Sequence, residues 1–143
     1  MNLEKMLPLL QCPRSGTSLA RIDAETLRSE AGATYPIVDG KPILVRRVEP
    51  LHVIPPRREV ISKNASAFSA PAFLPDEAVV VHLGCGDVPS ADGRVISIDI
   101  LPTSAADLVA EAEHLPIKTG SVDHLVSGAV FEHVYDPRAS AAE

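Results

Sequence analysis

One stretch, residues 79–87 with the sequence VVVHLGCGD, constrains the fold of this chain more than any other. A short run of branched apolar residues that ends in glycine is typical of a buried strand in a parallel sheet. Gly84 and Gly86 predict a tight turn after the strand, because glycine adopts positive φ and, lacking a Cβ, lets a ligand approach the backbone. Since open α/β sheets bind ligands at the carboxyl ends of their strands, the stretch predicts a strand followed by a binding turn.

A second apolar stretch, residues 94–99 with the sequence RVISID, ends in a carboxylate. An acid such as Asp99 at the tip of the neighbouring strand is placed to accept hydrogen bonds from both hydroxyls of a ribose. The third glycine of the dinucleotide fingerprint would fall at Pro89, which argues against a nicotinamide or flavin ligand. The link between the two strands is shorter than the dozen or so residues of a usual parallel crossover, so its helix should be reduced to a turn or absent.

Further motifs follow in a fixed order: residues 98–99 (ID), 107–112 (DLVAEA), 115–116 (LP), 120–127 (GSVDHLVS) and 132–134 (EHV). Together with the first strand and its turn, they resemble class I S-adenosylmethionine-dependent methyltransferases over roughly residues 78–137. The resemblance implies an α/β fold with a partial Rossmann-like, doubly wound parallel sheet. It implies S-adenosylmethionine as cofactor and methyl transfer as the activity, with the acceptor left open.

The resemblance also implies a set of cofactor-binding residues. In the family the glycine turn lies against the methionine part of the cofactor, the acid matching Asp99 binds the ribose, and the acid matching Glu111 lies near the adenine. The expected cofactor-binding residues are Gly84, Cys85, Gly86, Asp99, Ile100, Glu111, Ala112 and Ser127. His82 stands where many members have an acid, and Glu113 is expected to be a solvated acid.

No catalytic residue is assigned from the sequence. Glu132 and His133 follow the fourth strand, on the side where the family places substrate-contacting residues, and they are the only candidates. Methyl transfer to an atom that is already nucleophilic needs mainly proximity and alignment, so a general base is not required. His82 and His124 fall in predicted strands and are expected to be satisfied histidines of the core or of a strand end.

The first 47 residues predict a small β-rich domain. Short strands are expected at residues 18–22 and 26–30, and a hairpin at residues 34–45 bends at Asp39-Gly40. This segment resembles the small zinc-ribbon-like domain that, in eukaryotes, is the activator subunit of several methyltransferases. Cys12 matches the first zinc cysteine, but Ser15 replaces the second, and a structural zinc needs about four ligands, so no metal is expected. The implied role is to support a catalytic domain, and the alternative is a simple β-rich extension.

Residues 48–75 predict a proline-rich linker between this domain and a truncated cofactor-binding domain at residues 76–143. A short helix is expected within the linker, at residues 57–68. Phe68 or Phe73 should cover the cofactor or, as such aromatics more often do, pack the interdomain seam.

The uneven distribution of charged residues along the chain limits the kinds of partner that it can bind. Residues 1–75 carry ten Lys or Arg against seven Asp or Glu, whereas residues 76–143 carry three against twelve. The acidic second half argues against a nucleic-acid partner and suits a cationic ligand, although it would also simply aid solubility.

Two cysteines provide no disulfide framework, and Cys85 is expected to be a small packing residue. The absence of a signal peptide or a membrane-length apolar run predicts a cytoplasmic protein.

The end of the chain predicts a helix that starts at Asp136-Pro137, with an N-cap acid followed by proline at the first helical position. The resembled family would continue with further strands, so the domain looks truncated, and a protein partner could complete it. Two other interpretations stay open. One is a non-catalytic, activator-type protein with a vestigial cofactor fold, and the other is a fragment of a nicotinamide-binding oxidoreductase.

Overall fold

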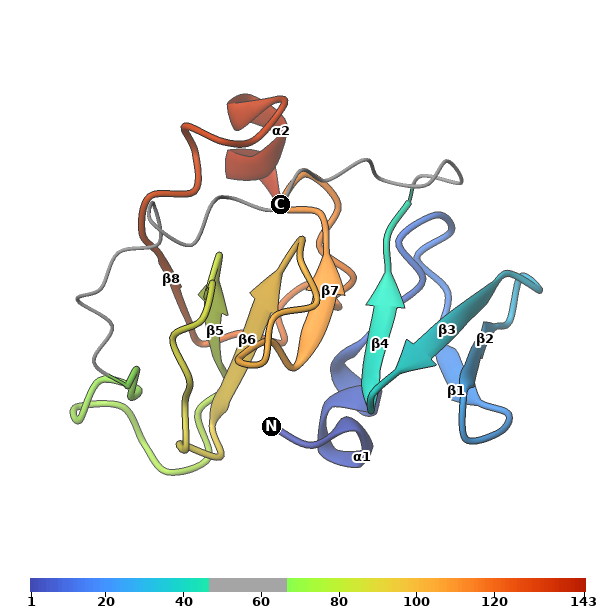
Figure 1. Ribbon diagram of the computed structural model, residues 1–143, viewed down its shortest axis with the longest axis horizontal. Helices are drawn as coiled ribbons and strands as arrows, with labels where there is room; N and C mark the ends of the chain where they lie inside the picture. The colour runs from blue at the N-terminus through green and yellow to red at the C-terminus, as the bar shows by residue number, and fades with distance from the viewer. Residues whose placement is uncertain (47–66) are drawn as a thin grey trace.

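A computed structural model describes residues 1–46 and 67–143 of the chain, so the helix expected at residues 57–68 and most of the linker lie outside the described residues. The strands form one eight-stranded sheet in the order β1-β2-β3-β4-β7-β6-β5-β8 (Figure 1). Their bounds are β1 Leu19–Arg21, β2 Thr26–Ser29, β3 Thr34–Val38, β4 Lys41–Leu44, β5 Val80–Leu83, β6 Val95–Asp99, β7 Leu108–Ala110 and β8 His124–Ser127. The helical elements are α1 (Leu3–Met6), the 3₁₀-helix η1 (Leu7–Leu9) and α2 (Pro137–Ala142).

The parallel part of the sheet has the strand order of a doubly wound α/β fold. From one side to the other it runs β7, β6, β5, β8, so the first strand of this part lies between the second and the fourth. This is the order of the first four strands of the Rossmann arrangement. The α/β, Rossmann-like prediction is confirmed, and the link from β5 to β6 contains no helix, as its length predicted.

The N-terminal strands continue the same sheet. Strands β1 to β4 form an antiparallel meander, and β4 then pairs in parallel with β7, with Ile43 opposite Val109 and Leu44 opposite Ala110. Asp39 and Gly40 both adopt positive φ at the bend between β3 and β4, which confirms the expected hairpin. The division into domains at residues 47 and 75 stays a prediction, but strands on both sides of it share one sheet.

The main hydrophobic core lies on one face of the sheet and also draws on both parts of the chain. Alternation along the strands points Leu83, Ile98 and Leu108 to the same face as Leu27 and Leu44. The N-terminal residues Met6, Leu10 and Cys12, all buried, belong to the same core cluster. The opposite face carries a smaller cluster of Ala70, Val80 and Val95, against which Phe68 and Leu74 pack.

Helix α1 was not expected from the sequence. Its N-cap Asn2 accepts a hydrogen bond from the Lys5 backbone N–H at 3.0 Å, and it buries Met6. The ammonium group of Met1 forms an ion pair with Asp107 at 2.8 Å and donates to the Val95 carbonyl at 3.1 Å. The first residues are therefore attached to the amino ends of the parallel strands.

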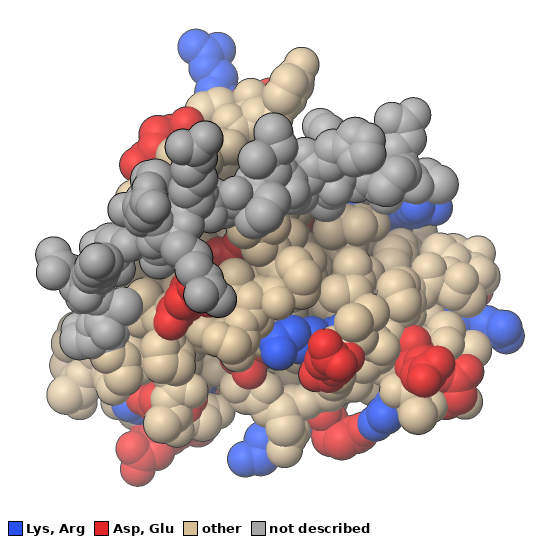
Figure 2. All heavy atoms as spheres, in the orientation of Figure 1, with Lys and Arg blue, Asp and Glu red and all other residues tan. Residues whose placement is uncertain are grey.

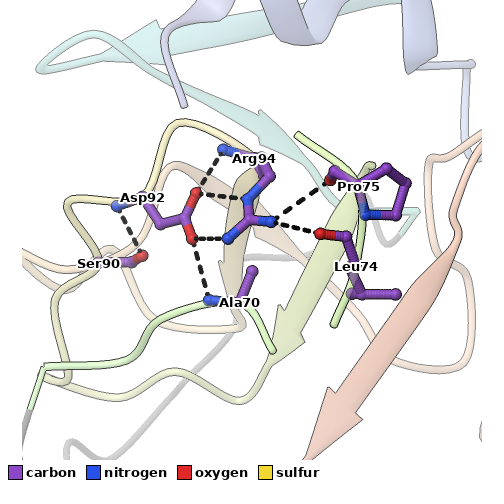
Figure 3. Close-up of polar contacts among 6 residues, drawn as sticks. All are labelled: Ala70, Leu74, Pro75, Ser90, Asp92 and Arg94. Atoms are coloured by element: carbon purple, nitrogen blue, oxygen red, sulfur yellow. Dashed lines mark hydrogen bonds and ion pairs between the residues drawn. The ribbon is translucent and has the colours of Figure 1, made fainter. Parts of the chain in front are cut away.

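A polar cluster holds residues 70–75 against the start of β6 (Figure 3). The Asp92 carboxylate accepts hydrogen bonds from the Arg94 backbone and guanidinium, the shortest at 2.8 Å, and from the Ala70 N–H at 3.1 Å. Arg94 Nη1 in turn donates to the carbonyls of Leu74 and Pro75 at 3.2 and 3.3 Å. The hydrogen bond from Arg94, with further backbone hydrogen bonds, holds the pKa of Asp92 well below its usual range.

Asp92→Ala should lower the free energy of unfolding at pH 7 by about 1–3 kcal/mol, because it leaves several donors without their acceptor. A carboxyl with a depressed pKa stabilises the fold above its unfolded pKa and loses that contribution as the pH falls below about 3.8. The difference between wild type and variant should therefore shrink in acid. Urea unfolding at pH 7 and at pH 3 measures both, with the exposed Glu77→Ala as control. An equal loss in the two variants at pH 7 would contradict the role of Asp92.

The described residues share the charge asymmetry of the sequence, with most of the acidic side chains in residues 67–143. On the face seen in Figure 2, acidic and basic side chains of the described residues lie interspersed toward the lower rim. No helix within the described residues is long and apolar enough to cross a membrane.

Candidate functional site

The expected glycine turn lies where the sheet topology favours ligand binding. The chain passes from β5 to β6 and β7 on one side and returns to β8 on the other, so the strand order reverses between β5 and β8. Ligands of open α/β sheets bind at the carboxyl ends of the strands at such a switch point. Gly84 and Gly86 follow β5 directly with φ values of 71° and 53°, which confirms the tight turn, called here the glycine loop (residues 84–86).

The two glycines have different surroundings. A Cβ added to Gly84 would overlap the methyl group Cγ2 of Val130, so a neighbouring segment already contacts this residue. A Cβ added to Gly86 would meet no atom of the described residues within 4 Å. The open side of the glycine loop is therefore at Gly86, where a ligand can approach the backbone.

Asp99 fixes the glycine loop from the end of β6. Its Oδ2 accepts a hydrogen bond from the Gly86 N–H at 2.8 Å, and its Oδ1 accepts one from the Leu101 N–H at 2.9 Å. The hydroxyl of Thr103 also donates to the Gly86 carbonyl. A carboxylate has about four lone-pair positions, so Asp99 retains acceptor capacity for hydroxyl groups of a ligand.

Cys85 points into the protein rather than toward a ligand. Its side chain is buried, and burial together with the nearby charge of Asp99 raises the pKa of the thiol to about 12. The thiol therefore stays protonated at neutral pH and is a poor nucleophile. This agrees with a packing role, and Cys85 contributes to a ligand site through its backbone.

Glu111, expected near the adenine, contacts the N-terminal part of the chain. It follows β7, is only 7% exposed, and its Oε2 accepts a hydrogen bond from the Arg46 backbone N–H at 3.0 Å. The Arg46 side chain lies beside His114, with Nη1 3.1 Å from the ring Nε2. Glu111 therefore holds the chain leaving β4 against the edge of the expected site.

Glu113, which the sequence predicts to be a solvated acid, is half-buried and also has backbone partners. Its Oε1 accepts hydrogen bonds from the backbone N–H groups of Tyr135 and Asp136, at 2.7 and 3.3 Å. Asp136 caps α2 as predicted, accepting from the backbone N–H groups of Arg138 and Ala139. Glu113 thus positions the start of α2, which lies on the side of the sheet toward which the β5 and β6 arrowheads point in Figure 1.

The remaining expected residues lie at or near the same edge. Ala112 is buried, Ile100 is half-buried, and the Ser127 hydroxyl at the end of β8 is buried without a hydrogen-bond partner among the described residues. Glu132 and His133, the catalytic candidates, are both exposed in the turn after β8, where the His133 N–H donates to the Val130 carbonyl at 2.8 Å.

His82 lies in β5 as predicted, but its hydrogen bonding differs from the prediction. Its ring stacks on Phe68 with centroids 4.2 Å apart, and its Nδ1 is buried without a partner in the described part of the chain. Ser97, opposite His82 on β6, also has a buried hydroxyl without a partner there. Burial lowers the pKa of His82, although the charge of Asp99 acts in the opposite direction. Phe68 thus packs on this face of the sheet.

The protein should lose stability as the pH falls below about 6.5, because burial lowers the pKa of His82 in the folded chain. A histidine whose folded pKa is lowered binds more protons when unfolded, so the free energy of unfolding rises with pH across the window that ends at its unfolded pKa. Unfolding measured from pH 5 to pH 7.5 should show this slope, and His82→Phe should reduce it. The exposed His133→Gln is the control and should keep the slope. If His82→Phe left the slope unchanged, the pH dependence of the free energy of unfolding would come from other titrating groups.

Cys12 does not build a metal site with other described residues. It is buried with its Sγ 3.0 Å from the Tyr35 hydroxyl, and no group of three or more His, Cys, Asp or Glu side chains that could hold a metal occurs in residues 1–46 and 67–143. Burial raises the pKa of the Cys12 thiol, but hydrogen bonds from Ser15, from Tyr35 and from the backbone outweigh it and lower the pKa to about 7.

Residues 81–143 match the family model described as "Methyltransferase domain". The match includes all of the expected cofactor-binding residues, and it shows that this part of the chain is similar to a methyltransferase domain. It does not reach strands β1 to β4, so the zinc-ribbon-like resemblance of the N-terminal segment gains no support. Comparison with curated proteins gives no match.

Proposed function

We propose that the edge formed by the carboxyl ends of β5, β6, β7 and β8 binds S-adenosylmethionine and that the protein transfers its methyl group to an acceptor. The observation that carries the proposal is the Asp99 carboxylate, which bridges the N–H groups of Gly86 and Leu101 at the end of β6. A fixed acid beside an open glycine, next to a topological switch point, suits a ligand that contains a ribose. The family match over residues 81–143 adds independent support.

In this proposal each part of the edge contacts one part of the cofactor. Gly84, Cys85 and Gly86 contact the methionine portion through backbone atoms, and Asp99 with Ile100 holds the ribose. Three further residues complete the set of cofactor contacts. Two of them, Glu111 and Ala112, lie on the adenine side, and the third, Ser127, lies at the end of β8.

When bound, the cofactor supplies a methyl group on a sulfonium, which is electrophilic without further activation. What the chain must provide is orientation, because alignment of an incoming nucleophile with the methyl group accounts for much of the rate in such a transfer. The excess of carboxylates in residues 76–143 suits the positive charge of the sulfonium and the ammonium. A cytoplasmic location and a protein partner stay predictions.

A second candidate function is a non-catalytic protein that retains the cofactor fold and binds a partner. The observation that favours it is the engagement of Glu111, whose Oε2 already accepts the Arg46 N–H. The parallel pairing of β4 with β7 suggests a supporting role for the N-terminal strands in either case. Copurification of an intact methyltransferase with a chain that binds no cofactor would favour this candidate.

Calorimetric titration with S-adenosylhomocysteine tests the proposal directly. We expect saturable one-to-one binding by the full chain, and no binding of nicotinamide adenine dinucleotide under the same conditions. Saturable binding of the dinucleotide alone would indicate an oxidoreductase fragment instead. Binding of neither ligand by a folded chain would reject the cofactor site and leave the partner-binding candidate.

A further inference from the structure

Val130 lies against Gly84 at the switch point of the sheet, where open α/β folds have their ligand crevice. The residue follows β8 in a turn of residues 128–131, called here the post-β8 turn, and its side chain packs against the main core. It lies so close to Gly84 that any Cβ there would overlap Cγ2 of Val130. The side chain therefore occupies the space above the first glycine of the glycine loop, between the ends of β5 and β8.

The backbone that positions Val130 is strained. Ala129 adopts a φ of 55°, in the left-handed region, and it is one of two non-glycine residues with positive φ among the described residues. Residues other than glycine occupy this region at a cost, and such outliers are often found at ligand clamps and switches. The residue before Ala129 is Gly128, which tolerates unusual backbone angles. The strain is thus confined to the turn that holds Val130 in the crevice.

A second unfavourable feature lies at the start of the same turn. The Ser127 hydroxyl is buried and has no hydrogen-bond partner in the described ranges 1–46 and 67–143. A buried hydroxyl without a partner is destabilising, because it has lost water and gained nothing in return. Movement of the post-β8 turn away from Gly84 would relieve the strain at Ala129 and give Ser127 access to water or to a ligand.

We infer that Val130 controls access to Gly84, the first glycine of the glycine loop, and that a ligand reaches Gly84 only when the post-β8 turn moves the Val130 side chain out of the crevice. The inference rests on the proposed function, since the ligand is the cofactor of that site. The strained Ala129 and the Ser127 hydroxyl, which has no partner among the described residues, make the closed turn less favourable than its packing alone indicates. When the post-β8 turn opens, Val130 loses its contact with Gly84. In return, the strain at Ala129 is relieved and the Ser127 hydroxyl gains access to a partner.

Two substitutions in the post-β8 turn should act in opposite directions. Val130→Ala removes the blocking methyl groups, so the association rate constant of S-adenosylhomocysteine should rise about tenfold. Ala129→Gly accepts positive φ at little cost and thereby stabilises the closed turn, so the apparent affinity should fall by about threefold to tenfold. Val134→Ala is the matched control, because Val134 packs against the same core but is not among the nearest neighbours of Gly84.

Surface plasmon resonance with the immobilised full chain measures the association rate, and calorimetry measures the affinity. Thermal unfolding of each variant checks that it is folded. Equal association rates for wild type, Val130→Ala and Val134→Ala, with wild type binding saturably, would overturn the inference and leave the proposed function intact. Binding by none of the folded proteins, Val130→Ala included, would instead reject the cofactor site itself and the access role with it.

Discussion

Replacing Asp99 by alanine is expected to weaken the binding of S-adenosylhomocysteine by about a hundredfold or more. The carboxylate would accept hydrogen bonds from the ribose hydroxyls, and a hydrogen bond to a charged group contributes about 1.5–3 kcal/mol. It also holds the glycine loop, because its two oxygens accept the N–H groups of Gly86 and Leu101. The substitution therefore removes a ligand contact and releases the loop at the same time.

Calorimetric titration measures this loss, and two further variants identify its cause. Asp87→Ala removes the same charge from an exposed acid directly after the glycine loop, and it should weaken binding only slightly. Asp99→Asn keeps one acceptor oxygen and should give an intermediate affinity. If Asp87→Ala and Asp99→Ala had similar effects, general electrostatic attraction rather than hydrogen bonding at the end of β6 would explain the binding.

Gly84→Ala should lower the free energy of unfolding by about 2–4 kcal/mol. Part of this cost comes from the positive φ of Gly84, about 1–2 kcal/mol for a residue with a Cβ. The rest comes from the overlap of the new methyl group with Val130, since overpacking typically costs about 1–3 kcal/mol. In Gly86→Ala the new methyl group has no neighbour within 4 Å in the described part of the chain, so the substitution should cost only about 1–2 kcal/mol.

Urea unfolding of the two glycine variants measures this difference, and a double substitution tests its origin. In Gly84→Ala combined with Val130→Ala, the smaller side chain at position 130 removes the overlap, so the two effects should not be additive. The cost of the backbone conformation should remain. Additive effects, or equal losses for Gly84→Ala and Gly86→Ala, would show that Val130 does not limit the space at Gly84.

Local sequence signals predicted the strands well, because each signal depends on a few neighbouring residues. The valine run before Gly84 became β5, the run ending in Asp99 became β6, and Asp39-Gly40 became a hairpin bend. The N-cap of α2 at Asp136 was also identified correctly. These features follow from alternation, glycine conformation and capping, which the chain expresses over short distances.

The contacts that shape the candidate site were harder to predict, because they join segments far apart in the chain. Nothing around Glu113 in the sequence indicates that it accepts the N–H groups of Tyr135 and Asp136. The close approach of Val130 to Gly84 likewise depends on how the post-β8 turn folds back on the sheet. The positive φ of Ala129 has no sequence signal, since alanine rarely adopts it.

The side-by-side placement of β4 and β7 also affects how the chain folds as it is made. Ile43 pairs with Val109, so one edge of β4 has no neighbour until the ribosome has added more than sixty further residues. During that interval the β1–β4 meander exposes a row of unpaired backbone groups along β4, which is a template for pairing with other nascent chains. Sequence-distant pairings of this kind also form slowly. The pairing of β4 is therefore completed only after β7 has been synthesised.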